Sequence, residues 1–198
     1  MRRATNPPVR ADELVAETFS RLLAGVGDTA KMGEHPAASG LAGAAHIEHP
    51  ALQRLYEYWQ RRRGARRFPR RGDIDPLEIG FILGYLMLLD VLRDPLRFKV
   101  RLHGTAMVMR AGYDLTGRLL DELPISDYRS YVIARCEGLV ATGEPAAIRS
   151  DRRLDRRTFS YEALWLPISE NGADVSMLLC ALIYDDERRS AATRVAPL

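Results

Sequence analysis

The sequence has little cysteine and no long apolar stretch. Its two cysteines, Cys136 and Cys180, are too few for a disulfide framework or a cysteine-based metal site. No apolar run approaches the ~18–20 residues that cross a bilayer. Two arginines near the N-terminus are not followed by an apolar core, and Asp12, Glu13 and Glu17 interrupt any signal helix. These absences predict a cytoplasmic protein with reduced thiols and no membrane span.

Catalytic motifs are absent as well. The sequence has no Gly-x-Ser-x-Gly elbow, no His-Glu-x-x-His and no glycine-rich phosphate loop with a lysine. Cys136 and His103 are the residue types of a nucleophile pair, but nothing in the sequence fixes their distance. His46 and His49 lie in a loose segment and lack the several ligands that a metal site needs. We therefore expect no enzyme activity and no bound metal.

Lysine is nearly missing, and arginine takes its place. Of 29 basic residues only Lys31 and Lys99 are lysines, and the formal net charge is +3. Residues 54–73 hold eight arginines against two acids, a balance of +6, and residues 149–157 hold five against two, a balance of +3. The Arg61–Arg71 and Arg149–Arg157 clusters fit a footprint for phosphates or an acidic partner. The first cluster also fits a solvated helix end, where cations complement the C-terminal helix dipole, and the small net charge favours this interpretation.

The length of 198 residues, 46% of them hydrophobic, suits one domain with appendages. Apolar residues recur at helical spacing from Leu14 to Leu23, and Gly25 and Gly27 would end that helix. A small, polar stretch follows from Asp28 to His49. The predicted organisation is an N-terminal helix with a flexible linker over residues 1–48, a domain over 49–187 and a disordered tail over 188–198.

Two helices are expected at the start of the domain. Pro50 opens the first, whose apolar stripe runs from Leu52 to Trp59 and which ends at Gly64. The second begins at Asp75-Pro76, with Glu78 completing a capping box, and continues to about Leu83.

The remaining elements alternate between strand and helix patterns. Residues 97–103 alternate polar and apolar side chains, as a half-buried strand does, and pair with the apolar run 86–92. A short helix with Thr105 as its cap and a longer helix from Ser126 to Gly143 occupy the middle. Strands are expected over 146–154, 158–166 and 176–184, with Asn171-Gly172 between the last two. The fold class is therefore α+β, with one five-stranded antiparallel sheet and helices on one face. The opposite face needs water, the first helix of the domain or a partner subunit as its cover.

Several local motifs occur in a characteristic order within this pattern. They are Trp59, Arg63-Gly64, the run Pro69–Pro76, Leu89-Asp90-Val91, the run Phe98–Thr105 and the run Gly112–Gly117. Together with the order of strands and helices they resemble the PAS-domain superfamily, in particular the alphaproteobacterial stand-alone PAS-like proteins. The resemblance covers residues 50–185. It implies a bacterial sensor or protein-interaction module that is commonly dimeric and whose ligands are mostly unassigned.

The known cofactors of PAS domains leave no clear signature in this chain. The Asn-Cys-Arg-Phe-Leu-Gln string of flavin photosensors is absent, and Cys136 lies in a different context. The helix over residues 126–142 contains no histidine to bind a haem. The cofactor is therefore left unassigned.

A pocket for a small organic ligand is one interpretation of the aromatic and methionine side chains, and a filled core is the other. We expect Met109 and Ala163 beside the pocket, and tyrosine hydroxyls or Arg135 would orient the ligand. The candidate ligand-binding residues are Met107, Tyr113, Tyr128, Tyr131, Arg135, Tyr161 and Trp165.

The sequence thus predicts a cytoplasmic signalling module that senses a small ligand or mediates protein–protein interaction, without an output domain of its own. It would act through an unidentified signalling partner and form a homodimer through the N-terminal helix and the outer sheet face. The alternative is nucleic-acid or nucleotide binding through the two arginine clusters.

Overall fold

A computed structural model describes residues 47–123, 126–154 and 157–185, and within them leaves out the side chains of residues 126, 127, 150–154 and 157–159. The predicted helix from Leu14 to Leu23 and the predicted tail lie outside the described residues. The domain boundaries given above therefore remain predictions.

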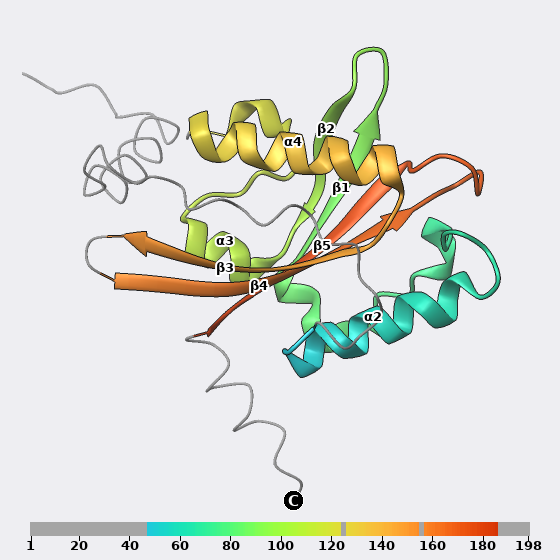
Figure 1. The fold of residues 1–198 in the computed structure, drawn as a ribbon, viewed down its shortest axis with the longest axis horizontal. Coiled ribbons are helices and arrows are strands. Elements are labelled where there is room, and N and C mark those ends of the chain that lie inside the picture. The colour runs from blue at the N-terminus through green and yellow to red at the C-terminus, as the bar shows by residue number, and fades with distance from the viewer. Residues whose placement is uncertain (1–46, 124–125, 155–156, 186–198) are drawn as a thin grey trace, which may run out of the picture.

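The centre of the fold is one five-stranded antiparallel sheet in the order β2-β1-β5-β4-β3 (Figure 1). This confirms the predicted fold class. Strand β5 is apolar along its length, which suits the centre of the sheet, because both faces are covered there. The strands are β1 (Leu86–Leu92), β2 (Arg97–His103), β3 (Ala146–Leu154), β4 (Arg157–Ile168) and β5 (Met177–Tyr184).

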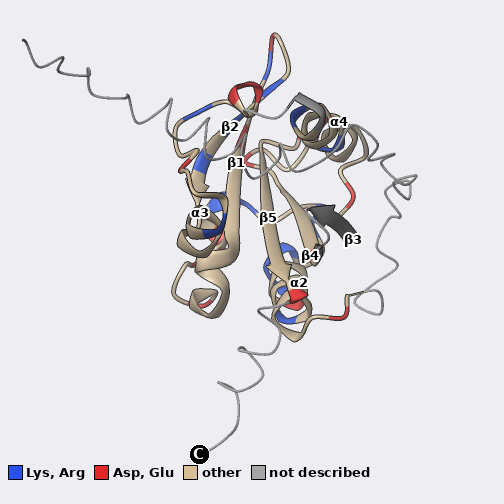
Figure 2. Cartoon of the chain, turned by 90° about the vertical axis from the view of Figure 1, so that its left-hand side faces the viewer, with Lys and Arg blue, Asp and Glu red and all other residues tan. Residues whose placement is uncertain are grey.

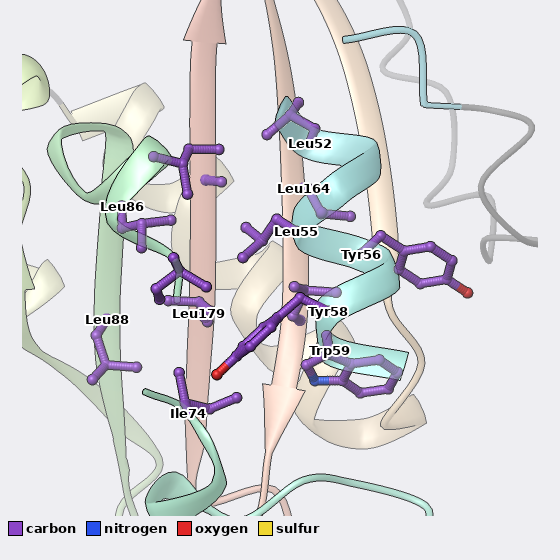
Figure 3. Packing of buried hydrophobic residues seen from close by; sticks show 14 of the residues in the cluster. Leu52, Leu55, Tyr56, Tyr58, Trp59, Ile74, Leu86, Leu88, Leu164 and Leu179 are labelled. Carbon is purple, nitrogen blue, oxygen red and sulfur yellow. The ribbon is translucent and has the colours of Figure 1, made fainter. Parts of the chain in front are cut away.

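Helix α2 (Pro50–Arg63) covers one face of the sheet, which we call the outer face (Figure 1). Its predicted stripe, including Leu52, Leu55 and Trp59, is buried against β4 and β5 (Figure 3). The Trp59 indole donates a hydrogen bond to the Pro167 carbonyl at 2.9 Å. The helix ends at Gly64, whose φ of +56° places it in the region that favours glycine. The outer face is thus covered by the first helix of the domain, one of the three covers considered above.

The start of α2 is held by a buried carboxylate on β4. Glu162 is 2% exposed, and its two oxygens accept the backbone N–H groups of Glu48 at 2.7 Å and His49 at 2.9 Å. The Arg149 guanidinium on β3 bonds Glu48 at 2.7 Å and Asp185 at 2.8 Å. These contacts join the segment before α2 to the residue after β5, across strands far apart in sequence.

The helix expected from Asp75 to Leu83 is a wrong prediction. Residues 76–79 form a turn, and a 3-10 helix follows over Gly80–Tyr85. The Asp75 carboxylate accepts the Leu77 N–H at 2.9 Å, and Glu78 pairs with Arg62 instead of closing a capping box. Two glycines in so short a segment disfavour the α-helix, whose nucleation is costly.

The inner face of the sheet is covered by the middle of the chain. It carries α3 (Thr105–Ala111) and α4 (Ser126–Thr142), both as predicted except that Gly104 rather than Thr105 is the N-cap of α3. It also carries the 3-10 helix Leu120–Glu122, which the sequence did not predict. Phe98, Val100, Tyr161, Trp165 and Cys180 belong to the buried cluster beneath them, which we call the inner core. The two cores lie on opposite faces of the same strands.

Candidate functional site

One face of α4 presents aromatic and cationic side chains to the inner core. Tyr128, Tyr131 and Arg135 follow one another at i, i+3 and i+7, the spacing that places residues on one side of a helix. The two tyrosines are half-buried against the inner core. The Arg135 guanidinium lies 5.3 Å from the centroid of the Tyr131 ring, within the range of a cation–π interaction.

The sheet supplies a second set of aromatic side chains. Tyr161 and Trp165 on β4 are buried in the inner core. The Tyr161 ring packs on Tyr184 of β5, with 5.8 Å between their centroids. Arg110 from α3 lies over the Tyr184 ring at 3.6 Å. Sequence reasoning missed Arg110 and Tyr184, although Tyr184 lies opposite Tyr161 in the strand pairing.

Helix α3 has no fully buried residue: Thr105 and Met109 are exposed, and the others are half-buried. Met107 is half-buried and lies outside the inner core as the structure describes it. Met109 is 83% exposed, so the expectation that it faces the pocket is wrong. Tyr113 follows α3 and packs against the inner core. Of the predicted ligand residues, the structure thus brings six to the inner core or its edge and leaves Met107 apart.

Burial favours the neutral forms of one phenol and two thiols at this site. Burial raises the pKa of Tyr113 to about 12, with a smaller contribution from Tyr184. Burial also raises the pKa of the Cys136 and Cys180 thiols, against a smaller lowering by the Arg135 charge. Both thiols are free and buried. At neutral pH they are protonated and poor nucleophiles.

His103 is neutral for a related reason. Burial lowers the pKa of its imidazole, and the Asp114 carboxylate, 3.7 Å away, opposes this only in part. Its Nδ1 accepts the Leu115 backbone N–H at 3.3 Å, a role that requires the unprotonated nitrogen. Within the described residues no hydrogen bond joins His103 to Cys136, the two residues considered above as a nucleophile pair.

Arg135 stands out because its charge has no partner. Its Nε and Nη1 atoms are buried and form no hydrogen bond. Within the described part of the chain no ion pair involves this residue. The residue as a whole is half-buried, but buried N–H groups without an acceptor are rare, because their desolvation is uncompensated.

The arginine cluster around α2 is largely engaged in contacts within the chain. Arg66 pairs with Asp73 at 2.7 Å, Arg62 with Glu78, and Arg67 donates to the Thr142 carbonyl at the end of α4. In the second cluster, Arg149 makes the two ion pairs given above. Figure 2 shows basic residues on α2, α3, α4 and near β2, rather than in one stripe.

Among the described residues, no group of three or more histidine, cysteine or acidic side chains is placed to hold a metal ion. None of the helices that the structure describes is long and apolar enough to cross a membrane.

The sequence matches the family model of the PAS domain over residues 47–183. The chain belongs to the PAS-domain family. The match covers every strand of the sheet and both helices on its inner face. This confirms the resemblance seen in the sequence, and it identifies a type of domain that is typically a sensory or signalling module. The comparison with curated proteins gives no match.

The similar solved structures are distant. A light-oxygen-voltage domain studied with a flavin analogue shares 14% identity, with 55% of this chain and 84% of that chain covered and a TM-score of 0.37. A fungal light-oxygen-voltage photoreceptor shares 15%, over 50% and 72% of the two chains, with a TM-score of 0.34. An RNA-binding light-oxygen-voltage receptor shares 19%, over 64% and 39%, with a TM-score of 0.34. Likenesses this distant carry no conclusion about ligand or partner.

Proposed function

We propose that this PAS domain is a non-enzymatic cytoplasmic sensor that binds a small organic ligand between α3, α4 and the inner face of the sheet. The observation that carries the proposal is the partial burial of α3, which covers this side with residues that are half-buried or exposed and none that is fully buried. A cover that contributes so little buried surface opens at low energetic cost. A ligand would therefore gain access here more readily than beneath α2, which has five buried residues.

The side chains beneath this cover suit an organic ligand. Tyr113, Tyr128, Tyr131 and Tyr184 are half-buried, so each offers an apolar ring and a polar tip. Apolar walls with a few well-placed polar groups are the usual composition of small-molecule sites. The two buried thiols are protonated at neutral pH, and the unprotonated Nδ1 of His103 already accepts the Leu115 N–H, which supports binding rather than catalysis by these groups.

Native mass spectrometry of the freshly purified full chain tests this function. We expect a bound mass on the wild-type protein and its loss in Tyr131→Ala, because the ring lies on the ligand-facing side of α4. Tyr56→Ala, which removes a ring from the outer core, is the matched control and should retain the ligand. Circular dichroism would verify that both variants are folded. A wild-type protein that is free of bound mass on purification contradicts the proposal.

A second candidate function is self-association through the outer face. An apolar cavity of about 70 Å³ lies there, and Leu83 and Leu102 at its edge are 37% and 40% exposed. Exposed apolar side chains around a cavity are typical of interaction surfaces. The cavity is lined by Arg71, Ile74, Pro76, Ile79, Leu83, Leu86, Leu88, Leu102, Ile168 and Leu179.

We infer that the occupant of this cavity is the apolar stripe Leu14–Leu23 of a second copy. The stripe is accompanied by the acids Asp12, Glu13 and Glu17. The basic side chain of Arg71, in the lining of the cavity, complements those acids. The partner is thus a second copy of the chain, with its N-terminal stripe in the cavity.

Light scattering of the full chain at tens of micromolar is expected to give the mass of a dimer. Leu102→Asp places a charge in the apolar lining and should weaken association at least about tenfold, since that corresponds to ~1.4 kcal/mol. Met109→Asp is the control, because Met109 is 83% exposed and does not line the cavity. A monomeric wild-type protein, or equal weakening by both substitutions, argues against this interface.

Nucleic-acid binding through the arginine clusters is the less supported alternative. Arg62, Arg66 and Arg67 are engaged with groups of the same chain, and Arg149 makes two ion pairs. These contacts favour a structural role, in which the cations tie α2 to the following loop and to the end of α4.

A further inference from the structure

The uncompensated charge of Arg135 identifies the kind of ligand that the inner site would take. Arginine does not lose its proton in proteins, so the guanidinium keeps its charge despite burial. Its Nε and Nη1 atoms are buried and without a hydrogen-bond acceptor. The Tyr131 ring, 5.3 Å away, offers only the weak attraction of a ring face.

The neighbouring groups do not supply the missing negative charge. Cys136 and Cys180 are the thiols on which the Arg135 charge acts, and burial raises the pKa of both. They stay protonated at neutral pH. Tyr113 likewise remains a neutral phenol. The domain therefore holds a half-buried cation on α4, with two buried N–H groups that lack an acceptor, beside thiols and a phenol that remain uncharged.

Such an arrangement is unfavourable without a ligand and favourable with the correct one. Burial of an unpaired ion costs free energy, which an anion recovers by accepting the buried N–H groups. Carboxylates and phosphates match the planar geometry of a guanidinium, and either would neutralise its positive charge. Tyr131 lies against Arg135, and the inner core that α4 covers contains further rings, Tyr161 and Trp165. They suit an apolar body more than a highly charged one, which favours a carboxylate with a single charge.

We propose that the ligand of this domain is an organic carboxylate with an aromatic or apolar body, anchored by Arg135. This inference rests on the proposed function, since it assigns a chemical class to the ligand of the same site. The carboxylate accepts hydrogen bonds from the buried guanidinium nitrogens, and the body packs against the rings of α4 and β4.

Thermal unfolding of the full chain tests the class with a pair of probes that differ only in charge. Phenylacetate is the carboxylate, and phenylacetamide is its neutral counterpart at the same ionic strength. At a concentration about ten times its dissociation constant, phenylacetate is expected to raise the wild-type Tm by about 3 °C. Phenylacetamide should raise it by less than about a third of that, because it brings no charge to Arg135.

Variants distinguish an anion site from a structural arginine. Arg135→Met keeps the length of the side chain and removes the charge. Its Tm without ligand should equal or exceed that of the wild type, and phenylacetate should leave it unchanged. Arg118→Met is the matched control, because Arg118 is an exposed arginine that pairs only at the surface with Glu122. Its Tm should respond to phenylacetate as the wild type does.

The possible results separate this inference from the proposed function. Equal stabilisation of the wild type by both probes, or an unchanged phenylacetate response in Arg135→Met, overturns the carboxylate class. Absence of any phenylacetate effect together with a lower Tm for Arg135→Met also overturns it and indicates a structural role for the arginine. A co-purified mass that Arg135→Met retains leaves the ligand-sensing function intact and removes only its anionic class. An acidic co-purified molecule that Arg135→Met loses supports both.

Discussion

Replacing Glu162 with alanine is expected to lower the free energy of unfolding by about 3 kcal/mol. The carboxylate is buried and accepts two backbone N–H groups immediately before α2. Hydrogen bonds to a charged group contribute about 1.5–3 kcal/mol each, and removal of the acceptor leaves both donors unsatisfied. The negative charge also lies near the N-terminus of α2, where its interaction with the helix dipole stabilises the helix. Part of this loss of stability is offset, because the substitution also removes the cost of burying a charged group.

Urea unfolding followed by circular dichroism measures this effect. Glu57→Ala, on the exposed side of α2, removes a carboxylate that is not buried and should change stability by less than about 0.5 kcal/mol. Glu162→Gln keeps the size of the side chain but replaces one acceptor oxygen with an NH₂ group. Its loss of stability should therefore lie between those of Glu57→Ala and Glu162→Ala. Equal effects of Glu162→Ala and Glu57→Ala would mean that Glu162 does not anchor the helix.

The helix and strand boundaries could be predicted from the sequence because they depend on local signals. Pro50 and Gly64 mark the two ends of α2, and the apolar runs of β1 and β5 match the observed strands within one residue. The same signals failed at Asp75-Pro76, where a capping pattern precedes a 3-10 helix. A cap stabilises a helix that the following residues favour, and Gly80 and Gly84 do not favour one.

The contacts between distant segments could not be predicted in the same way. Nothing in the sequence around Glu162 distinguishes it from a surface acid, because its partners Glu48 and His49 lie more than 100 residues away. At the candidate site, too, local features could be predicted from the sequence and contacts between distant segments could not. Helical spacing alone placed Tyr128, Tyr131 and Arg135 on one face of α4, whereas the Arg110 contact with Tyr184 depends on how α3 packs.

Gly104→Ala is the other substitution from which we expect a large effect, a loss of about 3 kcal/mol. The residue has φ −61° and ψ 144°, a conformation open to alanine, so backbone strain is not the cause. A Cβ here would lie 2.7 Å from the Gly84 carbonyl carbon, 2.8 Å from the Leu83 oxygen and closer still to the Gly84 oxygen. These are backbone atoms, so two segments must separate to admit the methyl group.

The position of Gly104 explains why this separation costs so much. Its N–H donates to the Leu86 carbonyl at 2.8 Å, where β2 ends beside the start of β1, and its carbonyl accepts from Val108 in α3. A shift of Gly104 therefore disturbs the β1–β2 pairing and the first turn of α3 together. Gly138→Ala in α4 is the matched control, since a Cβ there meets nothing within 4 Å and should stabilise the helix by about 1 kcal/mol. Opposite signs for the two substitutions in urea unfolding would establish close backbone approach as the reason for glycine at 104. A Gly104→Ala protein as stable as the wild type would show that the 83–86 and 104–108 segments can move apart freely.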